Sequence, residues 1–281
     1  MIKKIILISL GIIVLIVCGF AVYVSNMDWN GHKSKIETEI SNLIGEKVEL
    51  GGDLQVSLFP HPNIKATDIN IINQNNLEKL AFIKTMQTEV SLRSLLHKTP
   101  DIESLALNGV EIWYKADENG VSNWHQDKMP AFITADIDSR LQSFSLQNSI
   151  IHIDNEKYAF KADLSNFNVD IHAASLSGPY RLDGNFIKDD NHFGIALSIG
   201  SLMQPEDIGL TFAITHPDSN SYLRYDGIYN ADEDYFKGSV SGSSDKSADF
   251  VKVLFEKDVL ESQYNIPFIF SVEVEATHFT A

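Results

Sequence analysis

An uncharged apolar run near the start of the chain constrains the fold more than any other feature. It extends from Ile5 through Leu15 to Val24 without a charged residue. A helix of that length spans about 30 Å, which matches the hydrocarbon core of a bilayer. Two lysines precede the run, so the short N-terminal tail is expected in the cytoplasm. We predict an uncleaved transmembrane anchor within residues 1–29 and a body on the non-cytoplasmic side.

Three other interpretations of the run fit the sequence less well. A cleaved signal peptide needs small residues at its cleavage site, and Tyr23 to Met27 provide a poor one. A lipoprotein signal needs a cysteine after the apolar core, whereas Cys18 lies inside it. A buried core helix is rarely this long without a charge. Cys18 is the only cysteine, so the body has no disulfide.

Composition excludes several classes of partner. The 281 residues carry a formal net charge of -16, and the sequence has no basic stripe. Because nucleic-acid binding depends on neutralising phosphates, no nucleic-acid partner is expected. The same acidity opposes broad adhesion to anionic lipid surfaces.

A short amphipathic helix is predicted at residues 30–43. Ile36, Ile40, Leu43 and Ile44 recur at helical spacing and form one apolar stripe. Gly45 follows as a left-handed stop signal. The stripe fits a helix that packs on a core, or a helix that lies on the membrane surface.

Beyond Glu46 the apolar period changes to two, which predicts strands. The first are expected at 48–58, at 64–72 and at 85–92, with a brief helical turn at 94–97. Asn108-Gly109 is the dipeptide favoured in two-residue turns, so residues 101–115 are predicted to form a hairpin.

From Leu141 the sequence predicts an antiparallel meander, because turn residues recur about every 8–12 residues. A short helix at 247–255 and a last strand at 266–280 follow, and a chain that stops in a strand suggests a truncated or short relative of something longer. The strands are expected at 141–147, 149–154, 158–164, 167–173, 180–187, 192–200, 208–215, 221–229 and 235–242.

The predicted fold class is mainly β, with an N-terminal transmembrane helix and a short amphipathic helix. A curved antiparallel sheet is expected to form an elongated apolar groove. The predicted domains are the tail and anchor at 1–29, an α+β module at 30–130, and the meander at 131–281.

The sequence shows no chemistry-bearing motif. Its nine histidines are scattered, and no nucleophile elbow, Walker loop or dinucleotide-binding glycine motif occurs. We therefore expect no enzyme activity, no catalytic residues, no metal site and no cofactor.

Several short segments, taken in order, resemble the AsmA family of envelope proteins of Gram-negative-type bacteria. Their order and spacing are more specific than any one of them, and the resemblance covers essentially the whole chain. The segments are IGEKV at 44–48, GDLQVSLFP at 52–60, DINI at 68–71, VSLRSLL at 90–96, IESLALNGV at 102–110, NGVSNW at 119–124 and GPYRLDG at 178–184.

The resemblance implies a single-pass inner-membrane protein with a periplasmic body and a role in outer-membrane biogenesis. Larger relatives are similar to bridge-like lipid-transfer proteins, in which a long curved sheet carries phospholipid acyl chains on its concave face. This chain is short for the family. The alternative is an anchored assembly or scaffold factor for outer-membrane proteins that carries no lipid.

The candidate lining positions of the groove are alternating apolar residues in the predicted strands. Alternation is identical for an open groove and for an ordinary closed core, so both interpretations stay open at this point. The candidates are Leu54, Val56, Leu58, Ile151, Ile153, Val169 and Ile171.

Overall fold

The computed structural model describes residues 19, 23, 27–58, 61–91, 102–124, 143–173, 177–203, 206–231, 233, 235–246 and 266–277. The predicted anchor, with Ile5, Leu15 and Val24, lies outside these residues except for Gly19 and Tyr23. Within the described part of the chain, no helix is both long enough and apolar enough to cross a bilayer. The helical segments predicted at 94–97 and 247–255 also lie outside the described residues.

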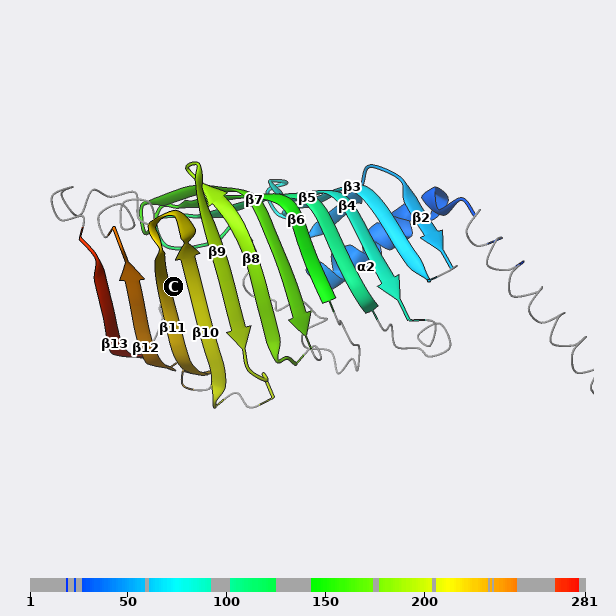
Figure 1. The fold of residues 1–281 in the computed structure, drawn as a ribbon. Coiled ribbons are helices and arrows are strands. Elements are labelled where there is room, and N and C mark those ends of the chain that lie inside the picture. Colours follow the sequence, from blue (N-terminus) through cyan, green and yellow to red (C-terminus); the bar gives the residue numbers. More distant parts are fainter. Residues whose placement is uncertain are drawn as a thin grey trace, which may run out of the picture.

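The protein is mainly β, as predicted, and its strands form one large curved sheet (Figure 1). The thirteen strands are β1 (Lys47–Leu50), β2 (Leu54–Ser57), β3 (Asn63–Ile72), β4 (Lys79–Val90), β5 (Ile102–Ala116), β6 (Ser143–Asn155), β7 (Phe160–Ala173), β8 (Tyr180–Lys188), β9 (Asn191–Ile199), β10 (Ile208–His216), β11 (Ser221–Asn230), β12 (Tyr235–Ser244) and β13 (Phe268–Thr277).

The predicted amphipathic helix is confirmed. A 3₁₀ turn, η1 (Trp29–His32), leads into α2 (Lys33–Ile44), and Gly45 ends the helix in the left-handed conformation with φ 83°. Three of the predicted stripe residues, Ile36, Ile40 and Ile44, pack against the core of the sheet. The helix therefore packs on the sheet, which was one of its two interpretations. A second 3₁₀ turn, η2 (Pro217–Ser219), joins β10 to β11.

The strands follow one another across the sheet in chain order, except that β1 and β2 both pair with β3. All pairs are antiparallel but one: β5 and β6 run parallel, so the prediction of a purely antiparallel sheet is wrong there. Parallel neighbours need a long crossover connection. Residues 117–142 provide it.

The predicted hairpin at Asn108-Gly109 is also wrong, because β5 runs through both residues as one strand. Gly109 has φ 63° and Asn148 in β6 has φ 51°. Asp68 in β3 and Asn166 in β7 also have positive φ. Each of these residues bends its strand without ending it. The register also shifts next to Asn148 and Asn166, as in a β-bulge, whereas the pairing of β4 with β5 keeps one register across Gly109.

The same bulges explain why two pairs of predicted strands are each one strand. The segments predicted at 141–147 and 149–154 join into β6 through Asn148, and those at 158–164 and 167–173 join into β7 through Asn166. Asparagine tolerates the left-handed conformation and is equally typical of turns. Sequence alone therefore does not separate a bulge from a turn.

Each bend shifts the alternation of side chains by one residue. In β5 the apolar positions are Leu105 and Leu107 before Gly109, and Val110 and Ile112 after it. Because the neighbouring strands shift at the matching place, the apolar side chains stay on one face of the bent sheet. Gly52, between β1 and β2, packs closely on β3 next to Asp68, where a Cβ would clash with Thr67 Oγ1.

Candidate functional site

A continuous row of side chains, all apolar or aromatic except Thr88, crosses the sheet from β2 to β13. Paired residues on neighbouring strands point to the same face, and every step of the row is a register pair. At about 4.8 Å between strands, the row is about 50 Å long. In order it consists of Val56, Ile64, Thr88, Leu105, Phe144, Ile171, Leu182, Leu197, Phe212, Tyr225, Val240 and Val272.

A second row runs beside the first, two residues away along each strand. Apart from two glycines, each of its members is apolar. In order they are Leu54, Ala66, Met86, Leu107, Leu146, Val169, Gly184, Ile195, Ile214, Leu223, Gly242 and Phe270. We call the face that carries both rows the inner face.

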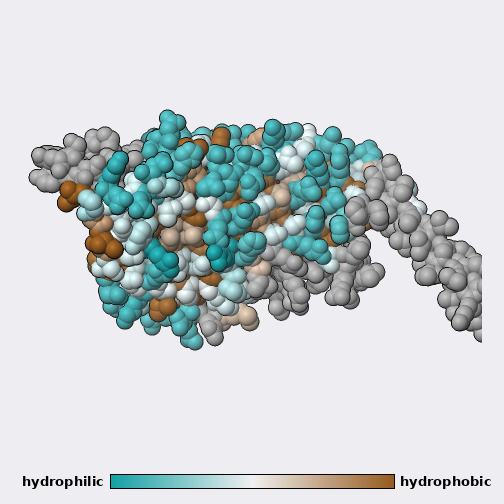
Figure 2. Space-filling view, in the orientation of Figure 1, coloured by the Kyte–Doolittle hydropathy of each residue, from teal (hydrophilic) through white to brown (hydrophobic). Residues whose placement is uncertain are grey.

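The opposite, outer face is polar along the same strands. Figure 2 shows it as mostly hydrophilic, with α2 hidden behind it in this view. Its residues alternate with those of the first row, as expected for a sheet with one wet side. One outer row consists of Asn63, Glu89, Ser104, Ser143, His172, Arg181, Ser198, Thr211, Asp226, Ser239 and Glu273.

Protein covers the inner face at its N-terminal end. Trp29 of η1 and the isoleucines of α2 pack against a buried cluster of side chains from β1 to β7. Val169 is 3% exposed and Leu54 4% exposed in this cluster. We call this part of the inner face the covered zone, and it is an ordinary filled core.

The inner face is different at β10 to β13, where it contains a hollow of about 370 Å³ lined only by apolar and aromatic side chains. This volume lies in the range of small-molecule sites. The described helices make their close contacts elsewhere: η1 with β2, α2 with β1, and η2 with β9. We call this part the open zone. Its lining residues are Leu210, Phe212, Tyr225, Phe236, Val240, Val274 and Ala276.

Most of the predicted lining residues lie in or next to the covered zone. Leu54 and Val169 are core residues, and Ile171 packs against them. Val56 belongs to the first row at the β2 edge. Leu58 follows the end of β2 and is half-buried.

Ile151 and Ile153 lie on the inner face of β6, between the bend at Asn148 and the end of the strand. Ile151 pairs with Ile112 and Leu164, and Ile153 pairs with Tyr114 and Ala162. Both side chains are half-buried. They are therefore separated along the sheet from the hollow of the open zone.

Sequence reasoning missed the residues of the open zone. The signal was present, because Leu210 and Phe212 alternate with polar or small neighbours as regularly as the predicted lining residues do. What the alternation did not indicate is which half of the sheet the helix covers. That depends on the packing of α2, which is a tertiary contact.

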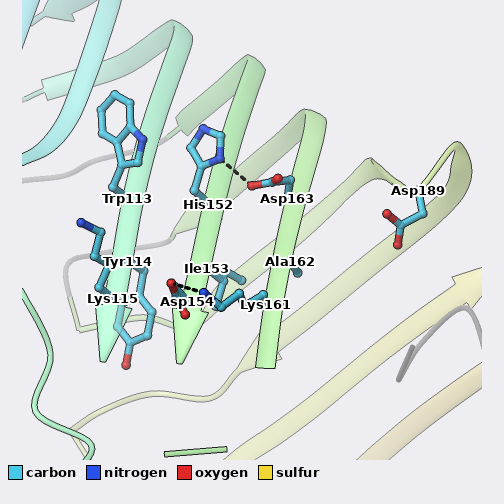
Figure 3. A pocket seen from close by; sticks show the side chains of 10 residues that line it. All are labelled: Trp113, Tyr114, Lys115, His152, Ile153, Asp154, Lys161, Ala162, Asp163 and Asp189. Atoms are coloured by element: carbon cyan, nitrogen blue, oxygen red, sulfur yellow. Dashed lines mark hydrogen bonds and ion pairs between the residues drawn. The ribbon is translucent and has the colours of Figure 1, made fainter. Parts of the chain in front are cut away.

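A polar cluster lies on the outer face at the ends of β5, β6 and β7 (Figure 3). There Trp113, His152 and Asp163 stand side by side on the three strands. The His152 ring is parallel to Trp113 at 5.8 Å, and its Nδ1 lies 2.6 Å from an Asp163 carboxylate oxygen. Its Nε2 lies 3.0 Å from a Glu111 oxygen. The imidazole thus links β5 to β7 across the parallel strand pair.

The two carboxylates raise the pKa of His152. Burial alone would lower it, but the hydrogen bonds to Asp163 and Glu111 outweigh burial and favour the charged imidazolium. The folded-state pKa is therefore above the unfolded one. The cluster stabilises the fold fully below the unfolded pKa, near 6.5, and this stabilisation is lost as the pH rises through the raised value.

We expect Asp163→Asn to lower the pKa of His152, measured from its imidazole proton shifts in NMR spectra of the full chain, because the change removes one of the two carboxylates that favour the imidazolium. An unchanged pKa of His152 in this variant would contradict the geometry of the cluster.

Among the described residues, no group of three His, Cys, Asp or Glu side chains is placed to bind a metal ion. In the hollow beside Trp113, Lys161 is paired with Asp154 at 2.8 Å (Figure 3), and Lys115 with Glu78. The arrangement with the clearest capacity to bind a ligand is the apolar open zone.

Comparison with known proteins gives one match. The family model of the AsmA family matches residues 1–210 of the 281. Neither the curated proteins nor the solved structures contain a significant match. The match extends from the predicted anchor through η1, α2 and the strands up to the start of β10. Since it covers well over half of the sequence, the chain belongs to the AsmA family.

Proposed function

We propose that this protein is an envelope protein that binds phospholipid acyl chains along the inner face of its sheet, which acts as a groove. One observation carries the proposal: two rows of side chains, apolar except for Thr88 and two glycines, cross twelve strands and lead into a hollow without polar lining. An acyl chain needs such a continuous apolar surface. It needs no catalytic group.

The energetics support a lipid ligand in the open zone. Each methylene that moves from water into an apolar site gains about 0.8 kcal/mol. Phe212, Tyr225 and Val240 are only half-buried in the protein alone, so an acyl chain would also remove their exposed surface from water. The polar outer face would keep the loaded sheet soluble.

The rest of the proposal rests on membership of the AsmA family and on the predicted anchor in the sequence. We propose a single-pass anchor in the inner membrane, a cytoplasmic N-terminus, a periplasmic body and a role in lipid transport for outer-membrane biogenesis, without enzyme activity. Outer-membrane assembly proteins are candidate partners. The alternative, an anchored scaffold without lipid, is favoured only by the covered zone, where η1 and α2 fill the inner face.

Photocrosslinking tests the proposal directly. A benzophenone amino acid at Phe212 points into the open zone, and one at Ala213 points to the outer face of the same strand. We expect lipid adducts at position 212, identified by mass spectrometry of the full chain crosslinked in cells, at least tenfold above those at position 213. Equal labelling at the two positions would favour the scaffold.

A further inference from the structure

The two edges of the sheet differ in how their backbone groups are satisfied. At the first edge, formed by β1 and β2, side chains of η1 and α2 accept the outward N–H groups. Such coverage prevents another strand from pairing there. The three bonds are Val48 N–H to Ser41 Oγ at 2.8 Å, Leu50 N–H to Glu37 Oε1 at 2.6 Å, and Leu54 N–H to Asn30 Oδ1 at 3.1 Å.

The second edge is β13. It pairs with β12 over its ten residues, from Phe268 opposite Ser244 to Thr277 opposite Tyr235. Its other side pairs with no strand in the part of the chain that the structure describes. A long edge strand with unpaired N–H and C=O groups is a template for another strand.

The side chains of β13 also offer exposed apolar surface to a neighbouring strand. Phe270 and Val272 carry the two apolar rows to the edge, where Val272 is still 53% exposed. On the outer face Ile269 is 78% exposed, and Figure 2 shows hydrophobic side chains gathered at this end. Exposed apolar groups of this kind mark an interaction surface when they are contiguous.

We propose that the edge of β13 binds an extended segment of another protein, in which apolar and basic residues alternate. The apolar residues would continue the inner face beside Phe270, Val272 and Val274. The basic residues would lie on the outer face beside Glu273 and Glu275, because opposite charges on adjacent strands stabilise a pair. The proposal stands whether or not the inner face holds lipid.

Charge selects this occupant over a second copy of the chain. Each copy carries a net charge of -16, so two copies repel each other at long range. The outer face of β13 presents acidic side chains, and Lys237 of β12 already faces Glu275. A segment with basic residues extends that pairing, whereas an acidic one opposes it.

The test uses the full chain in nanodiscs and fluorescent ten-residue peptides. The first peptide alternates Val and Lys, the second alternates Val and Glu, and the third has the Val and Lys residues in two blocks. A fourth is the Val–Lys peptide with every backbone amide N-methylated, which removes the N–H donors of both edges and keeps the charge. We expect the first peptide to bind at least tenfold more tightly than the other three, measured by fluorescence anisotropy.

Variants assign the binding to β13. Glu273→Lys should weaken binding of the Val–Lys peptide about tenfold and strengthen that of the Val–Glu peptide. Glu49→Lys, at the covered edge on β1, is the matched control and should change neither. Equal binding of the N-methylated peptide, equal effects of the two variants, or self-association of the chain through β13 would each overturn the proposal.

Discussion

Val169→Asp is expected to unfold the protein. Val169 is 3% exposed in the covered zone, within the cluster that η1 and α2 close. A carboxylate there has no partner and no water, and an uncompensated buried charge costs about 3–5 kcal/mol. That is a large part of the stability of a typical domain. Urea unfolding followed by tryptophan fluorescence would show a large shift of the midpoint or no folded baseline.

The same change in the open zone should have a different result. Val240 also lies on the inner face, but it is only half-buried beside the hollow. In Val240→Asp the carboxylate can stay hydrated, so the protein should fold with nearly the wild-type urea midpoint. Its lipid content, measured by mass spectrometry after purification, should fall at least tenfold, because a charge on the lining opposes acyl chains.

Ser241→Asp, on the outer face of the same strand, is the control for Val240→Asp. It should affect neither folding nor lipid content. If Val240→Asp unfolds the protein as completely as Val169→Asp, the open zone is a closed core and lipid carriage is refuted. If both variants fold and keep their lipid, the division of the inner face into two zones is wrong.

Gly109→Val is the second change with a large expected effect. Gly109 has φ 63°, a conformation in which a β-branched residue is strained by about 1–3 kcal/mol. A Cβ at this position would also lie 3.0 Å from the Cβ of Lys84 on β4. We expect the unfolding free energy to fall by about 2–4 kcal/mol, because the left-handed bend at Gly109 and its pairing with β4 are both disturbed.

Gly209→Val on β10 is the matched control. A Cβ on Gly209 meets no atom within 4 Å, and its φ is not positive. Valine favours strands, so this variant should be as stable as the wild type or slightly more so. A similar loss in both variants, measured by urea unfolding, would mean that Gly109 is needed only as a flexible residue and not for its conformation.

The elements that could be predicted are those specified by local pattern. The helix of Ile36 and Ile40 with its Gly45 stop, and strands such as β3 and β8 to β12, follow from periodicity and turn residues within a few positions. The structure confirms them with small shifts of their ends. The division into an apolar and a polar face also follows, since alternation along each strand implies it.

The errors occurred where one local signal fits two structures. Asn108-Gly109 is typical of a hairpin turn, yet the pairing with β4 and β6 on both sides holds it inside one continuous strand. The parallel pairing of β5 and β6 had no local signal, because strand direction depends on the path of the connection. Both outcomes are decided by partners that are distant in sequence.

The sequence by itself determined a one-faced sheet and an amphipathic helix, and it carried the segments that resemble the AsmA family. Only the tertiary structure decided which stretch of the apolar face the helix covers and which stretch stays open. The physical reason is that alternation records which side of a strand avoids water. What replaces the water, a packed helix at Val169 or a hollow at Val240, is set by contacts between elements far apart in the chain.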